Sequence, residues 1–301
     1  MTKIAFIGFG EAAQAMASGL AEEPGVSALS AFDIRFADGA QAPALSAKAA
    51  EWKVSTHAQI GEAVAAADIV LSLVVGSAAV HVGAEAGRVL KADQIFVDLN
   101  SISPDAKKKV GEALAQGGKA AFVEGAVMAR VPPYKHKVPI LLAGAAAERA
   151  AALLTKAGMD IEAVGTQIGQ ACAVKMIRSV IVKGVEALLI ESLTAAEKAG
   201  VRERILDSIS ETFPGIDWRQ TATYYIGRTQ QHGARRVTEM KEAAATLESL
   251  GLRPVLSLAI SETIKAAHEK LKASGLAFDK DYTELLAALA AEDEKAGGKA
   301  A

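Results

Sequence analysis

The stretch KIAFIGFGEAAQAMA, residues 3–17, decides the fold. Its first part, Lys3–Gly8, is a continuous apolar run typical of a buried strand, and Glu11–Glu22 has the spacing of an amphipathic helix. The letters GFGEAA between them match the pattern G-x-G-x-x-[GA]. Gly8 permits a tight turn, and Gly10 lets a pyrophosphate approach the backbone at the helix N-terminus. We therefore predict a phosphate-binding turn between a strand and a helix.

An acidic residue follows the next apolar run. Leu29–Phe32 ends at Asp33, at about the 20-residue distance that is typical of dinucleotide-binding units. A carboxylate there accepts hydrogen bonds from the adenine ribose, which favours NAD, whereas Arg35 can bind a 2′-phosphate, which leaves NADP open. A methyltransferase can also place an acid here, so this motif alone does not settle the cofactor class. The residues expected to contact the cofactor are Gly8, Phe9, Gly10, Glu11, Ala12, Ala13, Asp33, Arg35, Leu73 and Val74.

The first half of the chain alternates short apolar runs with helical patterns. Apolar strands separated by helices predict a parallel sheet covered on both faces, a doubly wound α/β fold of the Rossmann type. We assign residues 1–166 to this NAD(P)-binding domain. The further predicted strands are Ile69–Val74, Ile95–Leu99, Ala121–Val123, Ile140–Ala143 and Ile161–Val164, with helices at Ser77–Leu90 and Pro104–Ala115.

The second half is helical throughout. Residues 168–199 contain no proline and place apolar residues at helical spacing, which predicts one long helix. We therefore expect an all-α domain for substrate binding and dimerisation over residues 167–293, and a disordered tail at 294–301. The further predicted helices are Arg202–Thr212, Tyr224–Leu250, Val255–Ala273 and Tyr282–Ala291.

Composition excludes several classes of function. The net charge of −2 gives no general attraction to nucleic acid or to an anionic membrane. No run approaches the roughly 18 apolar residues of a membrane span. The single cysteine, Cys172, excludes an internal disulfide framework and fits a reducing compartment. We expect a soluble cytoplasmic protein with no metal site, because the histidines have no ligand-like partners at useful spacing.

Three later segments carry candidate chemistry: FVDLNSISP at 96–104, GAVM at 125–128 and GQACAVK at 169–175. Together with the glycine turn, they resemble the β-hydroxyacid dehydrogenase superfamily, which includes 3-hydroxyisobutyrate and 6-phosphogluconate dehydrogenases. The resemblance runs over essentially the whole chain. The second half is similar to an uncharacterised branch that carries Lys-Met-x-x-Ser-x-x-x-Lys-Gly, here 175–184, and His-x-x-Arg-Arg-x-x-Glu-Met, here 232–240.

The resemblance implies a catalytic role for Lys175. Hydride transfer between an alcohol and nicotinamide requires a group that takes or gives the hydroxyl proton, and a lysine withdrawn from solvent is suited to this. Ser101 follows a strand at the carboxyl edge of the sheet, where such folds bind ligands, and is expected to bind the substrate. Ser179 lies one helical turn after Lys175 and is expected on the same face.

Departures from the superfamily pattern concern the substrate. Ser179 stands where the classical members have asparagine, and Val182 stands where the decarboxylating members have glutamate, so we expect no decarboxylation. Met128 and Arg130 replace part of a Ser-Gly-Gly turn; Arg130 is expected either to bind a substrate carboxylate or to lie in a solvated loop. Arg235 is expected to bind an anionic substrate group or to form a structural ion pair.

These observations predict an NAD(P)-dependent dehydrogenase that acts on the hydroxyl or carbonyl group of a β-hydroxy acid or related alcohol, with Lys175 as general acid and base. Two alternatives stay open: an imine or enamine reductase on the same fold, and a sensor that binds NAD(H) without turnover. A methyltransferase is disfavoured because it would not be expected to combine a lysine-bearing long helix with an all-α domain. The excess of apolar residues on the long helix predicts a homodimer.

Overall fold

The computed structural model describes residues 1–277 and 280–291. Its two compact units are Met1–Lys175 and a second one that starts at Met176. The sequence predicts a boundary near residue 166, whereas the compact units divide inside helix α8, Gln170–Lys198. The tail expected at 294–301 lies outside the described residues.

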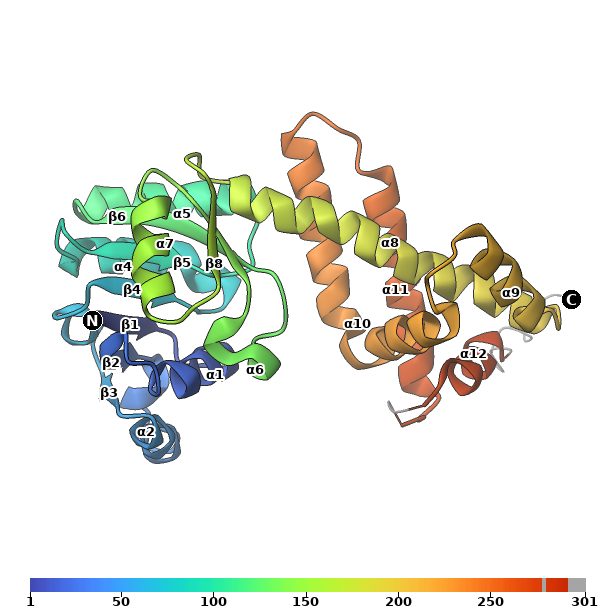
Figure 1. The fold of residues 1–301 in the computed structure, drawn as a ribbon, viewed down its shortest axis with the longest axis horizontal. Coiled ribbons are helices and arrows are strands. Elements are labelled where there is room, and N and C mark those ends of the chain that lie inside the picture. Colours follow the sequence, from blue (N-terminus) through green and yellow to red (C-terminus); the bar gives the residue numbers. More distant parts are fainter. Residues whose placement is uncertain (278–279, 292–301) are drawn as a thin grey trace, which may run out of the picture. The chain divides into compact units, whose positions relative to one another are not determined.

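The first unit is built on an eight-stranded sheet with the order β3-β2-β1-β4-β5-β6-β7-β8 (Figure 1). The predicted doubly wound α/β fold is confirmed. Because the strand order reverses between β1 and β4, the segments that follow β1, β4 and β5 come together at the carboxyl edge of the sheet, where folds of this kind bind ligands. The strands are β1 (Thr2–Ile7), β2 (Val26–Phe32), β3 (Val54–His57), β4 (Ile69–Ser72), β5 (Ile95–Asp98), β6 (Ala121–Val127), β7 (Ile140–Ala143) and β8 (Ile161–Gly165).

One strand pair departs from the predicted parallel sheet. Strand β7 pairs with β6 in the antiparallel direction, with Glu124 opposite Ala143 and Val127 opposite Ile140. A parallel pair requires a crossover that returns the chain to the other end of the sheet, usually through a helix. The connection between β6 and β7 contains only the short helices α6 (Val131–Tyr134) and η3 (Lys135–Lys137), so β7 returns antiparallel.

Helices cover both faces of the sheet, as Figure 1 shows. Successive side chains of a strand point to opposite faces, so Ile4 and Phe6 pack against α1 and α7, while Ala5 and Ile7 pack against α3, α4 and α5. Full burial of a side chain such as Phe6 contributes about 1.5–3 kcal/mol. The helices are α1 (Glu11–Leu20), α2 (Ala42–Glu51), α3 (Ile60–Val64), α4 (Ala79–Val89), α5 (Pro104–Gly117) and α7 (Ala147–Lys156), with η1 (Ile34–Ala37) and η2 (Gly76–Ala78).

Several short elements were not predicted from the sequence. Strand β3 reads VSTH and pairs only with β2 at the edge of the sheet, so it needs no apolar run, and only Val54 is buried. Helix α3 is little more than one turn long, and so short a segment shows no helical periodicity of apolar residues. Both elements owe their structure to tertiary packing.

The second unit is helical, as predicted, with α9 (Arg202–Thr212), α10 (Trp218–Ser249), α11 (Val255–Ala273) and α12 (Tyr282–Ala290) beside its part of α8. Its core joins apolar residues of all five helices, among them Leu193, Leu206, Ile226, Leu271 and Leu286. Helix α10 begins earlier than predicted because Asp217 caps it, accepting the amide hydrogen of Gln220 at 3.0 Å. Within the described residues, no helix is both long and apolar enough to cross a membrane.

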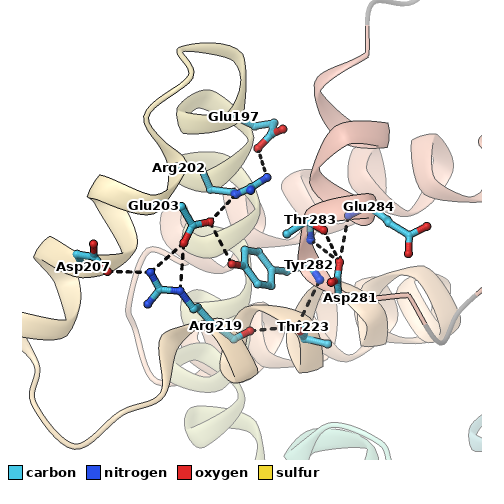
Figure 2. Close-up of polar contacts among 10 residues, drawn as sticks. All are labelled: Glu197, Arg202, Glu203, Asp207, Arg219, Thr223, Asp281, Tyr282, Thr283 and Glu284. Carbon is cyan, nitrogen blue, oxygen red and sulfur yellow. Dashed lines mark hydrogen bonds and ion pairs between the residues drawn. The ribbon is translucent and has the colours of Figure 1, made fainter.

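A charged network ties α9 to its neighbours in the second unit (Figure 2). Arg219 of α10 pairs with Glu203 at 2.8 Å and with Asp207 at 2.7 Å, both in α9. The Glu203 carboxylate also accepts hydrogen bonds from Arg202 and from the Tyr282 hydroxyl, and these donors lower its pKa. Because each cation here has a carboxylate partner and the network is exposed, we assign it a structural role.

Candidate active site

The glycine turn after β1 is tight and leaves the N-terminus of α1 uncovered. Gly8 has a φ of +88°, and a Cβ at this position would lie 2.4 Å from the carbonyl oxygen of Leu73. Gly10 caps α1 with extended backbone, and among the described residues nothing lies within 4 Å of where its Cβ would be. Ala13 is fully buried against the sheet. The N-terminus of α1, with its unsatisfied amide groups, therefore opens onto space that an anion can fill.

Asp33, immediately after β2, is already saturated by protein donors. Its Oδ2 accepts from the Phe9 amide and from Arg35 Nη2, both at 2.7 Å. Its Oδ1 accepts from the Arg35 amide at 3.0 Å and from Nε at 2.8 Å. Burial raises the pKa of Asp33, but the hydrogen bonds from Arg35 and Phe9 outweigh it, so the pKa lies below the ordinary 3.8. A carboxylate offers about four acceptor positions, and these four donors occupy them. Asp33 thereby fixes both the glycine turn, through Phe9, and Arg35.

Arg35 borders a pocket at the same end of the sheet. The pocket has a volume of about 410 Å³ and is lined by Arg35, Ala40, Gln41, Ala44, Leu45 and Lys48. Besides its pair with Asp33, Arg35 donates from Nη2 to the Phe9 carbonyl at 3.1 Å. The lining thus contains two cationic side chains and one amide.

The segments after β4 and β5 are joined by Asn100. Its Oδ1 accepts the amide hydrogen of Val74 at 2.7 Å, and its Nδ2 donates to the Ser72 hydroxyl at 3.2 Å and to Asp98. The amide of Leu73 in turn donates to the Ile7 carbonyl at 2.8 Å. Leu73 and Val74 are therefore held beside the glycine turn. Ser101 is the next residue after Asn100, whose side chain is held by these hydrogen bonds.

Lys175 and Ser101 are in direct contact. The Nζ of Lys175, on the first turns of α8, donates to the Oγ of Ser101 at 2.9 Å. Ser101 is exposed and Lys175 is half-buried, so the amine lies at the surface of the first unit. An amine beside a hydroxyl at the carboxyl edge of the sheet can exchange a proton with a bound alcohol or carbonyl.

Buried charges lie beneath this pair. Lys107 of α5 is fully buried; its Nζ donates to the carbonyl oxygens of Asp98 and Gly125 at 2.6 and 3.1 Å and lies 3.2 Å from Asp98 Oδ2. Glu124 of β6 is also fully buried and accepts the amide hydrogen of Ala171, in the first turn of α8, at 2.8 Å. Burial raises the pKa of Glu124, while the Lys107 charge and the α8 amides oppose that rise.

Lys107 and Glu124 are not among the residues predicted from the sequence, although the sequence pattern around each of them carries a signal. Lys107 shares the helical spacing of the buried Val110 and Leu114 and therefore belongs to the apolar face of α5. Glu124 interrupts an apolar strand between Val123 and Gly125. An ionisable residue on a buried face indicates a specific partner.

Met128 and Arg130 follow β6. Met128 is half-buried, and its amide donates to the Pro139 carbonyl at 2.9 Å. Arg130 is exposed and immediately precedes α6. Their roles as substrate ligands remain predictions.

The remaining predicted residues lie in the second unit. Ser179 is buried and accepts a hydrogen bond from Lys183 Nζ at 3.3 Å; Lys183 also pairs with Glu239 at 3.0 Å. Arg235 is largely exposed and lies 3.7 Å from Glu239. Its neighbour Arg236 points inward and pairs with the buried Glu186.

Glu186 is surrounded by donors within the second unit. Its two oxygens accept from the Thr229 hydroxyl and from Arg236 Nη1. Burial raises the pKa of Glu186, and the Arg236 charge acts in the opposite direction. Within the described residues, no group of three or more His, Cys, Asp or Glu side chains could hold a metal ion.

The sheet order, the glycine turn and the helical second unit together define a dehydrogenase-like Rossmann protein. A family described as NADP oxidoreductase, coenzyme F420-dependent, matches residues 3–101, and a domain of unknown function, DUF1932, matches residues 196–267. A conserved hypothetical protein from Sinorhizobium meliloti is 55% identical, with 96% of each chain covered and a TM-score of 0.86.

A further conserved protein of unknown function, reported to be structurally similar to 3-hydroxyacid dehydrogenases, is 30% identical; the match covers 91% of this chain and 100% of that one, with a TM-score of 0.73. The chain belongs to the β-hydroxyacid dehydrogenase-like superfamily, in an uncharacterised branch.

More distant structures share the fold alone. The 3-hydroxyisobutyrate dehydrogenase of Mycobacterium tuberculosis is 19% identical over 97% of this chain and 100% of that one, with a TM-score of 0.75. An imine reductase from Bacillus cereus is also 19% identical, over 95% and 98%, with a TM-score of 0.60.

Proposed function

We propose that this protein is an NAD(P)-dependent oxidoreductase that interconverts a hydroxyl group and a carbonyl group, with a β-hydroxy acid as substrate. The observation that carries the proposal is the contact between Lys175 Nζ and Ser101 Oγ. It lies at the same edge of the sheet as the glycine turn, and superfamily membership supports the same reaction type.

The nicotinamide ring, when bound, accepts or gives the hydride at the substrate carbon. In the oxidation direction, the neutral amine of Lys175 takes the proton of the substrate hydroxyl as the carbon–hydrogen bond breaks, and in reduction the ammonium returns it. The Ser101 hydroxyl holds the amine in place and offers a hydrogen bond to the same substrate oxygen. The open N-terminus of α1 beyond Gly10 is where we place the pyrophosphate.

For the cofactor we propose a preference for NADP(H). The sequence favoured NAD because Asp33 was expected to accept hydrogen bonds from a ribose. In the structure Arg35 and the Phe9 amide already fill the acceptor positions of that carboxylate. Arg35 and Lys48 line the adjoining pocket and suit a 2′-phosphate. The family description that names NADP supports this choice.

For the substrate we propose a carboxylate bound by Arg130 beside Met128. Ser179 and Arg235 remain proposed substrate ligands.

For the assembly we propose a homodimer. Exposed apolar side chains, Ile177, Ile181 and Leu188, follow one another at helical spacing along α8 in the second unit. A second copy of the chain is the partner that we propose for this face.

The test is nicotinamide absorbance with NAD and NADP against β-hydroxy acids, 3-oxo acids and cyclic imines. We expect turnover with hydroxy acids, lowered about 10²- to 10⁴-fold by Lys175→Ala with cofactor affinity unchanged. Lys198→Ala, an exposed lysine at the other end of α8, is the control. Turnover of imines alone would favour an imine reductase. Tight cofactor binding without any turnover would favour a sensor.

A further inference from the structure

Glu124 holds the beginning of the helix that carries Lys175. Its Oε1 accepts the amide hydrogen of Ala171 at 2.8 Å and lies 3.4 Å from the amide of Cys172. These are first-turn amides of α8, which have no partner within the helix. A carboxylate at a helix N-terminus satisfies those donors and interacts favourably with the helix dipole.

The same turn is fixed on a second side. The thiol of Cys172 donates to the carbonyl oxygen of Ile102 at 2.8 Å, and Ile102 follows Ser101 directly. Lys175 lies one helical turn beyond Ala171. The backbone that supports the amine and the loop that supports the hydroxyl are therefore joined through buried groups.

Lys107 has hydrogen-bond and ion-pair partners other than Glu124. Its Nζ donates to the carbonyl oxygens of Asp98 and Gly125 and forms an ion pair with Oδ2 of the Asp98 carboxylate at 3.2 Å. Two buried acidic side chains thus accompany one buried lysine, and of the two it is Glu124 that meets the amides of α8. The second oxygen, Glu124 Oε2, has no hydrogen-bond partner within the described residues. An apolar side chain would fill this place at lower desolvation cost if packing were its only purpose.

We infer that Glu124 is a positioning residue for Lys175: its carboxylate fixes the first turn of α8 so that the amine meets the hydroxyl of Ser101. This inference rests on the proposed function of Lys175. Glu124 itself touches no reacting atom. Loss of the anchor lets the first turn move, and displacements of about 1 Å near a reacting group cost up to about 10²-fold in rate.

The test compares Glu124→Met with Glu124→Gln. The methionine variant loses the acceptor, whereas the glutamine variant keeps a carbonyl oxygen for the α8 amides. We expect Glu124→Met to lower kcat about tenfold to a hundredfold with KM and cofactor Kd unchanged, and Glu124→Gln to restore most of the rate. Glu112→Met, at an exposed glutamate of α5, is the matched control. If Glu124→Met does not fold, Glu124→Asp keeps the charge but withdraws the carboxylate by one methylene, and should show a smaller loss of kcat alone.

Hydrogen exchange of the amides of Ala171 and Cys172 gives a second readout that needs no substrate. Exchange should be faster in Glu124→Met and close to wild type in Glu124→Gln. If the wild type is active and Glu124→Met has the same kcat, the positioning role alone is overturned. A Glu124→Gln variant with a kcat no higher than that of Glu124→Met would overturn it as well. A wild type without turnover would overturn the proposed function, and with it the positioning role, even where faster exchange confirmed the anchor.

Discussion

The Nζ of Lys175 donates to the Oγ of Ser101 at 2.9 Å, although 74 residues separate the two. Both ends of this contact are fixed by buried groups. Asn100, beside Ser101, is held by Asp98 and Ser72, and α8 is held at its first turn by Glu124. The two side chains are therefore held in contact by the protein itself, as the proposed catalytic role of Lys175 requires.

Removal of the Ser101 hydroxyl should weaken catalysis more than substrate binding. In Ser101→Ala the Lys175 amine loses its hydrogen-bond acceptor, and a hydrogen bond of this kind contributes about 0.5–1.5 kcal/mol, which is a factor of roughly 2 to 10 in rate. Steady-state kinetics should show this loss in kcat, with cofactor affinity retained. Ser192→Ala, at an exposed serine of α8, should match wild type. An unchanged kcat in Ser101→Ala would show that the amine is positioned without the hydroxyl.

Arg35→Ala should shift the cofactor preference toward NAD(H). The change removes a cation from the proposed 2′-phosphate site and at the same time leaves the Asp33 carboxylate able to accept ribose hydroxyls. Charge-assisted hydrogen bonds contribute about 1.5–3 kcal/mol, so the ratio of the two affinities should change more than tenfold. Lys48→Ala should weaken NADP(H) alone. Fluorescence titration with both cofactors measures the ratio, and Lys119→Ala is the exposed control. Equal weakening of both cofactors in Arg35→Ala would contradict the proposed preference.

Asp33→Asn should destabilise the protein in a pH-dependent way. The pKa of Asp33 is lowered in the folded protein, so its stabilisation is fully present above the unfolded value of about 3.8 and is lost as the pH falls through the folded value. At neutral pH the free energy of unfolding should fall by about 1–3 kcal/mol, as expected for hydrogen bonds to a charged group. Denaturant titrations from neutral to acidic pH should show that the difference in the free energy of unfolding between wild type and variant shrinks as the pH falls. Asp93→Asn, at an exposed carboxylate before β5, should show no gap at any pH.

Much of this architecture could be predicted because local pattern and tertiary structure agree. The run Lys3–Gly8 and the glycines after it required a buried strand and a tight turn, and Gly8 indeed has a positive φ. The antiparallel β7 could not be predicted in this way. Its sequence, ILLA, is as apolar as that of a parallel strand, and direction depends on the path of the chain before it.

For the candidate site, the sequence names residues but does not report the contacts between them. Lys175 and Ser101 were both singled out, whereas their hydrogen bond depends on long-range folding that no local pattern reports. Asp33 was expected to face a ribose, yet nothing in the sequence shows that the Arg35 side chain would donate hydrogen bonds to the Asp33 carboxylate. Buried charge on an otherwise apolar face, as at Lys107, was the available signal for the network beneath the site.

Charged substitutions on the exposed apolar face of α8 should prevent dimerisation. Ile181→Glu and Leu188→Glu each place a carboxylate where we propose that a second copy packs, and a buried unpaired charge strongly opposes association. Light scattering at micromolar concentration should give a dimer for the wild type and a monomer for each variant. Glu191→Gln on the same helix should leave the dimer intact. A monomeric wild type would overturn this proposal.

Lys107→Met should cost far more stability than the same change at the next residue. Lys107 is fully buried, and its removal leaves the carboxylates of Asp98 and Glu124 buried without a cation, at a cost of about 3–5 kcal/mol in the free energy of unfolding. Lys108 is exposed and pairs with Asp105 on the helix surface, so Lys108→Met should change stability by about 0.5 kcal/mol or less. Asp98→Asn added to Lys107→Met should recover part of the loss, because it removes one of the uncompensated charges. Denaturant unfolding of the four proteins measures this, and equal stabilities for the two lysine variants would show that the buried ammonium does not hold the site together.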